Sequence, residues 1–340
     1  VCAFNDIWMF LANRIAEKLG LPPVVAPEVL ELSANKSKMR DRLAQAGIEA
    51  TGYRLVESKE QVAQALEDIG PTCILKPVDG ESSSGVAKLS GVEDIDPSLE
   101  WFRLSGHHFP ALVESFLAGD EYSVEGISEA GKHHILAITR KYKDAKTFVE
   151  KGHVVPAPLP DDVAQEIRFH VTRVLTALGF TSGPSHTEVI LTAAGPRIVE
   201  THTRVGGDRI IDLVRLTTGV DVYELVARQA IGESIAARLP APVTYERAAA
   251  IWYACPSVAP ELVLARVEGE EAVRATSWID TVHLAKPPGE RGGPVLNSFD
   301  RTALVIATGK DAEEALCRAR DGVHKLQFHY RWQSSDQPGS

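Results

Sequence analysis

Two glutamates, twelve residues apart, are the first candidates for chemistry in this sequence. Glu188 and Glu200 each lie in a short apolar segment, and the turn-forming residues 192–196 separate the two segments. We expect the segments to pair as a hairpin, which can bring both carboxylates onto one face. Neighbouring carboxylates repel each other unless a cation lies between them, and Mg²⁺ prefers oxygen ligands. The pattern indicates a Mg²⁺ site, and two glutamates on a solvated face are the alternative.

Lys76 is the second candidate, because it ends a buried-looking segment and precedes a polar loop. The apolar segment is 73–77, and the loop, rich in glycine and serine, is 79–86. Such a loop offers backbone N–H groups to a phosphate, and the lysine adds a fixed positive charge. The sequence lacks the Gly-Lys-Ser/Thr pattern of a P-loop. Phosphate binding is one interpretation, and a solvated loop after an edge strand is the other.

Three more polar residues could contact a substrate. Arg204 lies four residues after Glu200, beside a Gly-Gly pair, where it could hold a phosphoryl group or a carboxylate. A structural salt bridge to Asp208 would explain the same arginine. Glu150 and His153 lie close together, so the imidazole could bind a substrate amine or orient a reacting group. A surface histidine is the alternative at that position.

The spacing of apolar residues predicts the elements that must position these side chains. In the first helix we expect Leu11, Ile15, Ala16 and Leu19 to face the core. A turn is expected at residues 118–120. We expect helices at about 11–19, 36–47, 58–69, 161–178, 208–216, 221–231 and 311–325, and strands at 51–55, 73–77, 111–117, 122–127, 134–139, 186–191, 197–201, 247–254, 278–284 and 303–308.

Length and composition narrow the class of protein. The chain has 340 residues, enough for two or three domains, and the mixture of hairpins and helices indicates an α+β fold. A net charge of −10 argues against a nucleic-acid binder. The four cysteines show no metal-binding spacing, which is typical of a reducing, cytoplasmic setting. No apolar run approaches the ~18 residues that a membrane span needs, so we expect no membrane partner.

Together these features resemble the ATP-grasp superfamily. Lys36 and Lys76 match its two ATP lysines, and residues 80–86 match the flexible loop that covers the phosphates. Glu188 and Glu200 match its Mg²⁺ carboxylates, with His202 where a common Asn would stand. The resemblance implies ATP and Mg²⁺ as cofactors, adenine held by main-chain groups of 114–117 and ribose held by an acid. The residues it assigns to the nucleotide are Lys36, Lys76, Ser82, Ser83, Ser84, Gly85, Glu114, Phe116, Leu117 and Glu121.

Within that superfamily the chain most resembles the L-amino-acid ligases, which make dipeptides. The matching segments are 148–153, 186–189 and 204–208. The resemblance implies that Glu150, His153 and Arg204 line the amino-acid and acyl-phosphate site. It implies Glu188 and Glu200 as metal ligands. His202, in place of that Asn, is the third candidate ligand, although imidazole suits softer ions than Mg²⁺.

The same resemblance divides the chain into lobes. It implies an ATP-grasp fold, with two α+β lobes that clasp ATP and a separate C-terminal α+β lobe. Family members carry further N-terminal sequence, so we expect residues to be missing before Val1. The expected parts are 1–30 as the end of an N-terminal domain, 31–118 as the small lobe, 119–239 as the large lobe, 240–330 as the C-terminal lobe and 331–340 as a disordered tail.

The activity implied is amide formation between a small-molecule carboxylate, such as an amino acid, and an amine. ATP would phosphorylate the carboxylate, because oxide is a poor leaving group and phosphate is a good one. A homodimer is one possible assembly. A small-molecule phosphotransferase and a non-catalytic nucleotide-binding module are the alternatives, and a third keeps the ligation but takes an antibiotic precursor or a carrier-bound group as acceptor.

Overall fold

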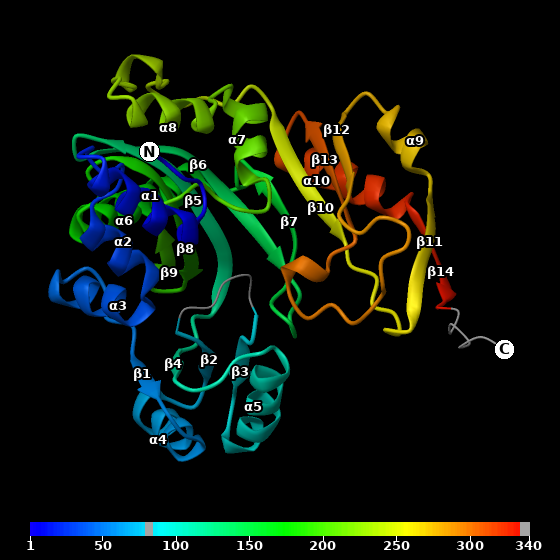
Figure 1. Cartoon of the computed structure of the whole chain (residues 1–340), viewed down its shortest axis with the longest axis horizontal. Helices are drawn as coiled ribbons and strands as arrows, with labels where there is room; N and C mark the ends of the chain where they lie inside the picture. The colour runs from blue at the N-terminus through cyan, green and yellow to red at the C-terminus, as the bar shows by residue number, and fades with distance from the viewer. Residues whose placement is uncertain (79–83, 334–340) are drawn as a thin grey trace.

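The computed structural model describes residues 1–78 and 84–333, and it shows three sheets flanked by helices (Figure 1). The predicted α+β fold is confirmed, and its helices and strands interleave along the chain. Over the described ranges, no helix is both long enough and apolar enough to cross a membrane. The predicted phosphate-loop residues Ser82 and Ser83 fall outside the described residues, as do 334–340 of the expected tail.

Three helices open the chain. They are α1 (Asp6–Lys18), α2 (Pro27–Ala34) and α3 (Lys36–Gln45). Asn35 begins α3, because its side chain accepts the Lys38 N–H and so satisfies one backbone donor of the first turn. The predicted inner face of α1 is only partly correct: Ala16 is buried, but Leu11, Ile15 and Leu19 are 45%, 39% and 62% exposed. Met9 and Ala12 are buried in their place.

A small lobe follows, built on a four-stranded sheet in the order β1-β4-β2-β3. Its core lies between this sheet and two helices. Ser58 caps α4 as predicted, accepting from the Gln61 N–H. The strands are β1 (Tyr53–Val56), β2 (Cys73–Pro77), β3 (Ala87–Leu89) and β4 (Ala111–Ser115), and the helices are α4 (Lys59–Ile69), η1 (Val92–Asp94) and α5 (Ile95–Leu104).

The large sheet has eight strands in the order β12-β13-β10-β7-β6-β5-β8-β9. Those from the middle of the chain are β5 (Gly119–Glu129), β6 (Lys132–Lys143), β7 (Glu150–Val155), β8 (Gly183–Thr192) and β9 (Gly195–His202). The turn predicted at 118–120 is wrong, since Gly119 already pairs with Thr192. A Cβ at Gly119 would lie 2.1 Å from the Leu191 carbonyl oxygen, so close strand packing explains this glycine.

Helices cover both faces of the large sheet. On one face, α6 (Asp161–Leu178) buries Ile167, Val171, Val174, Leu175 and Leu178, at the helical spacing predicted from the sequence. On the other face lie α7 (Ile210–Thr218) and α8 (Val222–Ala230). Val189 and Ile198 of the hairpin β8–β9 pack in the same core as α6, so the opposite face of the hairpin can carry polar groups.

The last third of the chain extends the same sheet. β10 (Ala248–Ala254) pairs with β7, and β13 (Ala303–Gly309) and β12 (Ile279–Leu284) continue outward. The C-terminal lobe expected at 240–330 therefore contributes β10, β12 and β13 to the large sheet. Arg331 and Trp332 lie in β14, so the expected tail is wrong at these two residues. The remaining elements are η2 (Ala236–Arg238), β11 (Leu262–Glu268), α9 (Glu270–Arg274), η3 (Ser298–Asp300), α10 (Ala312–His324) and β14 (Gln327–Trp332).

Candidate active site

Glu188 and Glu200 lie opposite each other on the paired strands β8 and β9, as the hairpin prediction required. Their side chains are only 13% and 15% exposed, and each has a cationic partner. Lys141 contacts Glu188, and the Lys36 ammonium lies 2.9 Å from Glu200. Burial alone would raise the carboxyl pKa values, but Lys141 and Lys36 hold the pKa of Glu188 and of Glu200 well below the usual range. The hairpin therefore presents two anionic carboxylates.

A hollow of about 780 Å³ opens on one side of these carboxylates. It lies between the small sheet and the β5–β9 part of the large sheet, so both lobes wall it. The predicted nucleotide residues that line it are Lys36, Lys76, Ser84, Glu114, Phe116, Leu117 and Glu121. Gly85 does not line it. That glycine adopts φ 70°, and a Cβ there would lie 2.5 Å from the His107 ring.

The Glu114 carboxylate is buried between two cationic side chains. It pairs with Lys76, and the Arg40 guanidinium donates to it at 3.3 Å. Burial, with the nearby cations Arg40 and Lys36, lowers the pKa of Lys76 despite Glu114. The Phe116 N–H donates to the Thr72 carbonyl, so this donor is not available to a ligand.

Glu121 shares two lysines that were absent from the predicted site. The Lys141 and Lys143 ammonium groups lie 3.1 and 2.6 Å from its carboxylate. Lys141 is 2% exposed at its side chain, and although burial opposes its charge, Glu188, Glu121 and Glu150 raise its pKa well above the ordinary value. The alternation Lys141-Tyr142-Lys143 in a strand could have indicated that both ammonium groups face one side.

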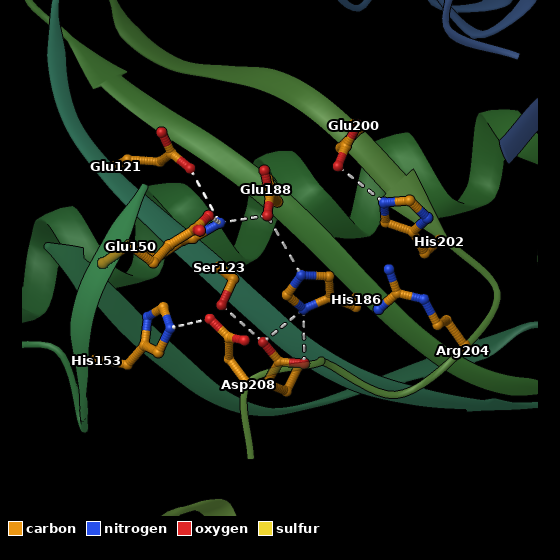
Figure 2. Close-up of polar contacts among 12 residues, drawn as sticks. Glu121, Ser123, Glu150, His153, His186, Glu188, Glu200, His202, Arg204 and Asp208 are labelled. Carbon is orange, nitrogen blue, oxygen red and sulfur yellow. Dashed lines mark hydrogen bonds and ion pairs between the residues drawn. The ribbon is translucent and has the colours of Figure 1, made fainter. Parts of the chain in front are cut away.

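A second hollow, of about 500 Å³, opens on the other side of the two glutamates. Figure 2 shows several of its lining residues as sticks. Glu188 and Glu200 line both hollows, so they stand between them. All three predicted catalytic residues line the second hollow. Its lining residues are Lys141, Glu150, His153, His186, Glu188, Glu200, Arg204, Gly207, Asp208, Ile210 and Ser298.

Asp6, from the start of α1, holds two of the site residues. Arg204 Nε donates to its carboxylate at 2.6 Å, and His202 Nδ1 lies 3.1 Å from the same oxygen. Burial alone would raise the pKa of Asp6, but His202 and Arg204 lower it to about 2. Sequence reasoning missed Asp6, which lies 198 residues from Arg204 along the chain.

His202 has neither ring nitrogen available for a metal in this arrangement. Its Nε2 lies 3.0 Å from Glu200, and its Nδ1 faces Asp6. No group of three or more His, Cys, Asp or Glu within the described ranges is arranged to hold a metal by itself. The opposed oxygens of Glu188 and Glu200 fit Mg²⁺, whose other ligands are commonly water and nucleotide phosphate. The donor set therefore fits Mg²⁺ through the two glutamates, without the histidine.

His186 forms a buried polar group with two residues of β5. Its Nδ1 lies 2.9 Å from Glu125, which also accepts a hydrogen bond from the Ser123 hydroxyl (Figure 2). Although burial disfavours the charged ring, Glu125 raises the pKa of His186 to about 9. The imidazolium Nε2 lies 3.6 Å from Glu188. The alternation His186-Thr187-Glu188 in a strand could have shown that this histidine shares a face with the glutamate.

His153 and Glu150 are held by residues that come later in the chain. His153 Nε2 lies 3.0 Å from Asp208, and the Ser298 hydroxyl donates to Glu150 at 2.6 Å. Burial alone would raise the pKa of Asp208, but hydrogen bonds from Arg301 and His153 hold it far below the ordinary range. The alternative salt bridge from Arg204 to Asp208 is not formed, because Arg301 takes that place.

Comparison with known proteins identifies two parts of the chain. Residues 69–212 match the family described as ATP-grasp domain, and residues 258–331 match L-amino acid ligase C-terminal domain 2. Alanine–anticapsin ligase of Bacillus subtilis is 26% identical over 247 residues, which cover 65% of this chain and 52% of that protein. Uncharacterized protein y4rH of Sinorhizobium fredii is 32% identical over 227 residues, with 65% and 46% covered. The chain thus spans about half the length of these curated relatives.

Solved structures show the same fold. The L-amino acid ligase from Bacillus licheniformis superposes with a TM-score of 0.82 at 23% identity, covering 96% of this chain and 79% of that one. The phosphoribosylglycinamide synthetase from Anaerococcus prevotii gives 0.72 at 17% identity, with 96% and 81% covered. At these identities the likeness describes the fold, and the chemistry must come from the site.

Proposed function

We propose that this chain, which carries an ATP-grasp domain over residues 69–212 and an L-amino acid ligase C-terminal domain over residues 258–331, joins a small-molecule carboxylate to an amine at the expense of ATP. The observation that carries the proposal is the placement of Glu188 and Glu200 between two hollows. One hollow has lysines suited to a nucleotide, and the other has Arg204, Glu150 and His153 suited to an organic substrate.

The nucleotide would lie in the first hollow, with its phosphates directed at the two glutamates. Lys36 and Lys76 would hold the phosphates, and Glu121 would hold the ribose. The main-chain carbonyl of Phe116 would contact adenine. Mg²⁺, bound by the two glutamates, would neutralise charge on the phosphates during transfer.

The carboxylate substrate would lie in the second hollow, within reach of Arg204. Its oxygen attacks the γ-phosphorus of ATP, the bond to the β-phosphate oxygen breaks, and ADP leaves with those electrons. The arginine stabilises charge on the transferring group, since its guanidinium is always protonated. The product of this step is an acyl-phosphate, which water would destroy if the hollow stayed open.

The amine then attacks the carbonyl carbon of the acyl-phosphate. The carbon–oxygen bond to phosphate breaks, inorganic phosphate leaves, and the nitrogen loses a proton to give the amide. Glu150 and His153 line the same hollow and are the groups available to hold an amino group of either substrate. The relatives named as alanine–anticapsin ligase and as L-amino acid ligase support an amino acid as one substrate.

The test uses the full chain with ATP, Mg²⁺ and pools of amino acids and other amines. Phosphate release and product mass are followed together. The proposal expects phosphate release that requires both a carboxylate and an amine, with one new amide mass. A phosphorylated product that forms without any amine would overturn it in favour of a phosphotransferase.

A further inference from the structure

Arg301 lies in the segment before β13. Each nitrogen of its guanidinium donates a hydrogen bond to a residue that lines the second hollow. Arg301 is 8% exposed and lies outside the matched ATP-grasp residues 69–212. Its Nη1 and Nη2 donate to the two carboxylate oxygens of Asp208, the first at 2.7 Å. Its Nε donates to the Ser298 carbonyl at 2.7 Å, and Nη1 also reaches the Glu150 carbonyl at 3.3 Å. A forked contact of this kind fixes both distance and orientation.

Tyr253, on β10, completes the hold on Asp208. The Arg301 guanidinium lies 3.7 Å from the centre of the tyrosine ring, and the tyrosine hydroxyl donates to the Asp208 carbonyl at 2.9 Å. Both the main chain and the side chain of Asp208 are therefore held by the last third of the chain. The three side chains form one unit, which we call the Arg301 clamp (Arg301, Tyr253 and Asp208).

The backbone under the clamp is in an unfavourable conformation. Asp208 has φ 53° and Arg209 has φ 59°, in the left-handed region that non-glycine residues rarely adopt. Two such residues in succession persist only where surrounding contacts hold them. They end the turn that begins with Arg204, the residue proposed to contact the transferring phosphoryl group.

The clamp also reaches the other proposed substrate residues. Asp208 Oδ2, which accepts from Arg301, lies 3.0 Å from His153 Nε2. Since a carboxylate only accepts hydrogen bonds, His153 must carry its proton on Nε2, and its buried Nδ1 has no partner among residues 1–78 and 84–333. Glu150 is held next to the clamp by the Ser298 hydroxyl.

We propose that Arg301 is a positioning residue of this enzyme: through Asp208 it sets the tautomer of His153 and the shape of the Arg204–Arg209 turn, and so prepares the second hollow for the organic substrate. The inference rests on the proposed ligase function. None of the clamp residues lines the first hollow, so the clamp acts on the organic substrate and leaves the nucleotide untouched. A guanidinium that served only stability would show no such selectivity.

The experiment compares Arg301→Met and Arg301→Lys with a matched control, Arg320→Met. Arg320 also stacks on an aromatic ring of β10, at 4.2 Å from the centre of the Trp252 ring, and it lines neither hollow. Adjacent residues of a strand face opposite sides of the sheet, so the control removes an equivalent contact from the far face. Rates are measured as ATP-dependent hydroxamate formation, with hydroxylamine as the amine and an amino-acid pool as carboxylates, and as amide formation with the natural pool.

We expect Arg301→Met to lower kcat/KM for the organic substrates by about 100-fold, because displaced side chains in the lining of the second hollow no longer orient these substrates correctly. Its KM for ATP should stay within about twofold of wild type, as should every constant of Arg320→Met. Arg301→Lys should recover only part of the loss, since an ammonium cannot form the forked contact. Adding Asp208→Asn to Arg301→Met should cost little more, because both changes break one contact.

Two results would overturn the inference. One is that Arg301→Met raises the KM for ATP by as large a factor as it lowers kcat/KM for the organic substrates, which would give Arg301 a general structural role. The other is wild-type kcat/KM for Arg301→Met. A wild-type protein that forms neither hydroxamate nor amide would instead count against the proposed function, so the two failures are distinguishable.

Discussion

Acidic side chains that line the two hollows form close ion pairs with basic side chains. Glu188 lies against Lys141, and Glu200 lies between Lys36 and His202. Each buried charge has a partner, as the cost of desolvating an isolated charge requires. Removing one charge therefore leaves another uncompensated, and variants should be isosteric so that the loss of chemistry can be separated from a loss of stability.

Glu188→Gln and Glu200→Gln should each lower ADP formation by about 1000-fold, because the amide cannot supply the negative oxygen that Mg²⁺ needs. Glu271→Gln, an exposed position on α9, is the control and should behave as wild type. ADP release in the presence of both substrates is the measurement. Retention of full turnover in either glutamine variant would show that this glutamate does not hold the metal.

Asp6→Asn should lower kcat/KM for the carboxylate by about 10-fold and leave the KM for ATP unchanged. The neutral amide holds Arg204 less firmly, because charge-assisted hydrogen bonds are roughly twice as strong as neutral ones. Steady-state kinetics with each substrate varied in turn is the check. A change confined to ATP would contradict this assignment of Asp6.

The contribution of the Asp208 ion pair to stability should decrease as the pH becomes acidic. The folded-state pKa of Asp208 is depressed below its ordinary 3.8, so its contribution is complete above 3.8 and is lost progressively as pH falls from 3.8 towards the folded-state pKa. At neutral pH, Asp208→Asn should destabilise the fold by about 3 kcal/mol, since it leaves Arg301 buried without its partner. Urea unfolding at neutral pH and at about pH 3 measures the difference. A gap between wild type and variant that does not shrink in acid would contradict the account.

At the residue level, the sequence predicted those site residues whose partners lie nearby or whose spacing is characteristic. Glu188 and Glu200 fall on one hairpin, so their pairing follows from local rules. Asp6 and Arg301 could not be found in this way, because they meet their partners across 198 and 93 residues. Such contacts depend on how the strands are ordered, which single-sequence patterns do not specify.

At the scale of elements, the junction of β7 and β10 matters most for the site. β7 carries Glu150 and His153, and β10 carries Tyr253, so the register of this pair aligns the predicted substrate residues with the clamp. Gly152 lies directly opposite Trp252 in that register. A Cβ at Gly152 would lie 2.2 Å from the Trp252 ring and 2.5 Å from the Ile251 carbonyl oxygen. Only glycine permits this close approach.

Gly152→Ala should destabilise the protein by about 2 kcal/mol and lower turnover together with it, because β7 must move away from β10. Gly293→Ala is the matched control, since a Cβ there meets nothing within 4 Å. Thermal unfolding and ligase turnover of both variants are compared. Equal melting temperatures for Gly152→Ala and wild type would contradict this prediction, because they would show that β7 and β10 accommodate the added methyl group without loss of stability.

At the scale of the whole molecule, three distant parts of the chain build the second hollow or hold its lining residues. Asp6 comes from α1, the paired carboxylates come from β8 and β9, and Ser298 and Arg301 come from the segment before β13 (Figure 1). Hydrophobic periodicity predicted the individual helices and strands, whereas the division into ATP-grasp lobes came from the family resemblance. The sequence did not predict that β10, β13 and β12 continue the large sheet. The alternation of polar and apolar residues identifies a strand, but it does not specify which strand lies beside it.

The central claim, that a carboxylate is activated as an acyl-phosphate, is tested most directly by following its oxygen. The carboxylate substrate is labelled with heavy oxygen and incubated with the full chain, ATP, Mg²⁺ and the amine. The mass of the released phosphate is then measured by mass spectrometry. The account predicts one labelled oxygen in each phosphate released, because the carboxylate oxygen attacks phosphorus and leaves with it. Unlabelled phosphate accompanying amide formation would contradict the account.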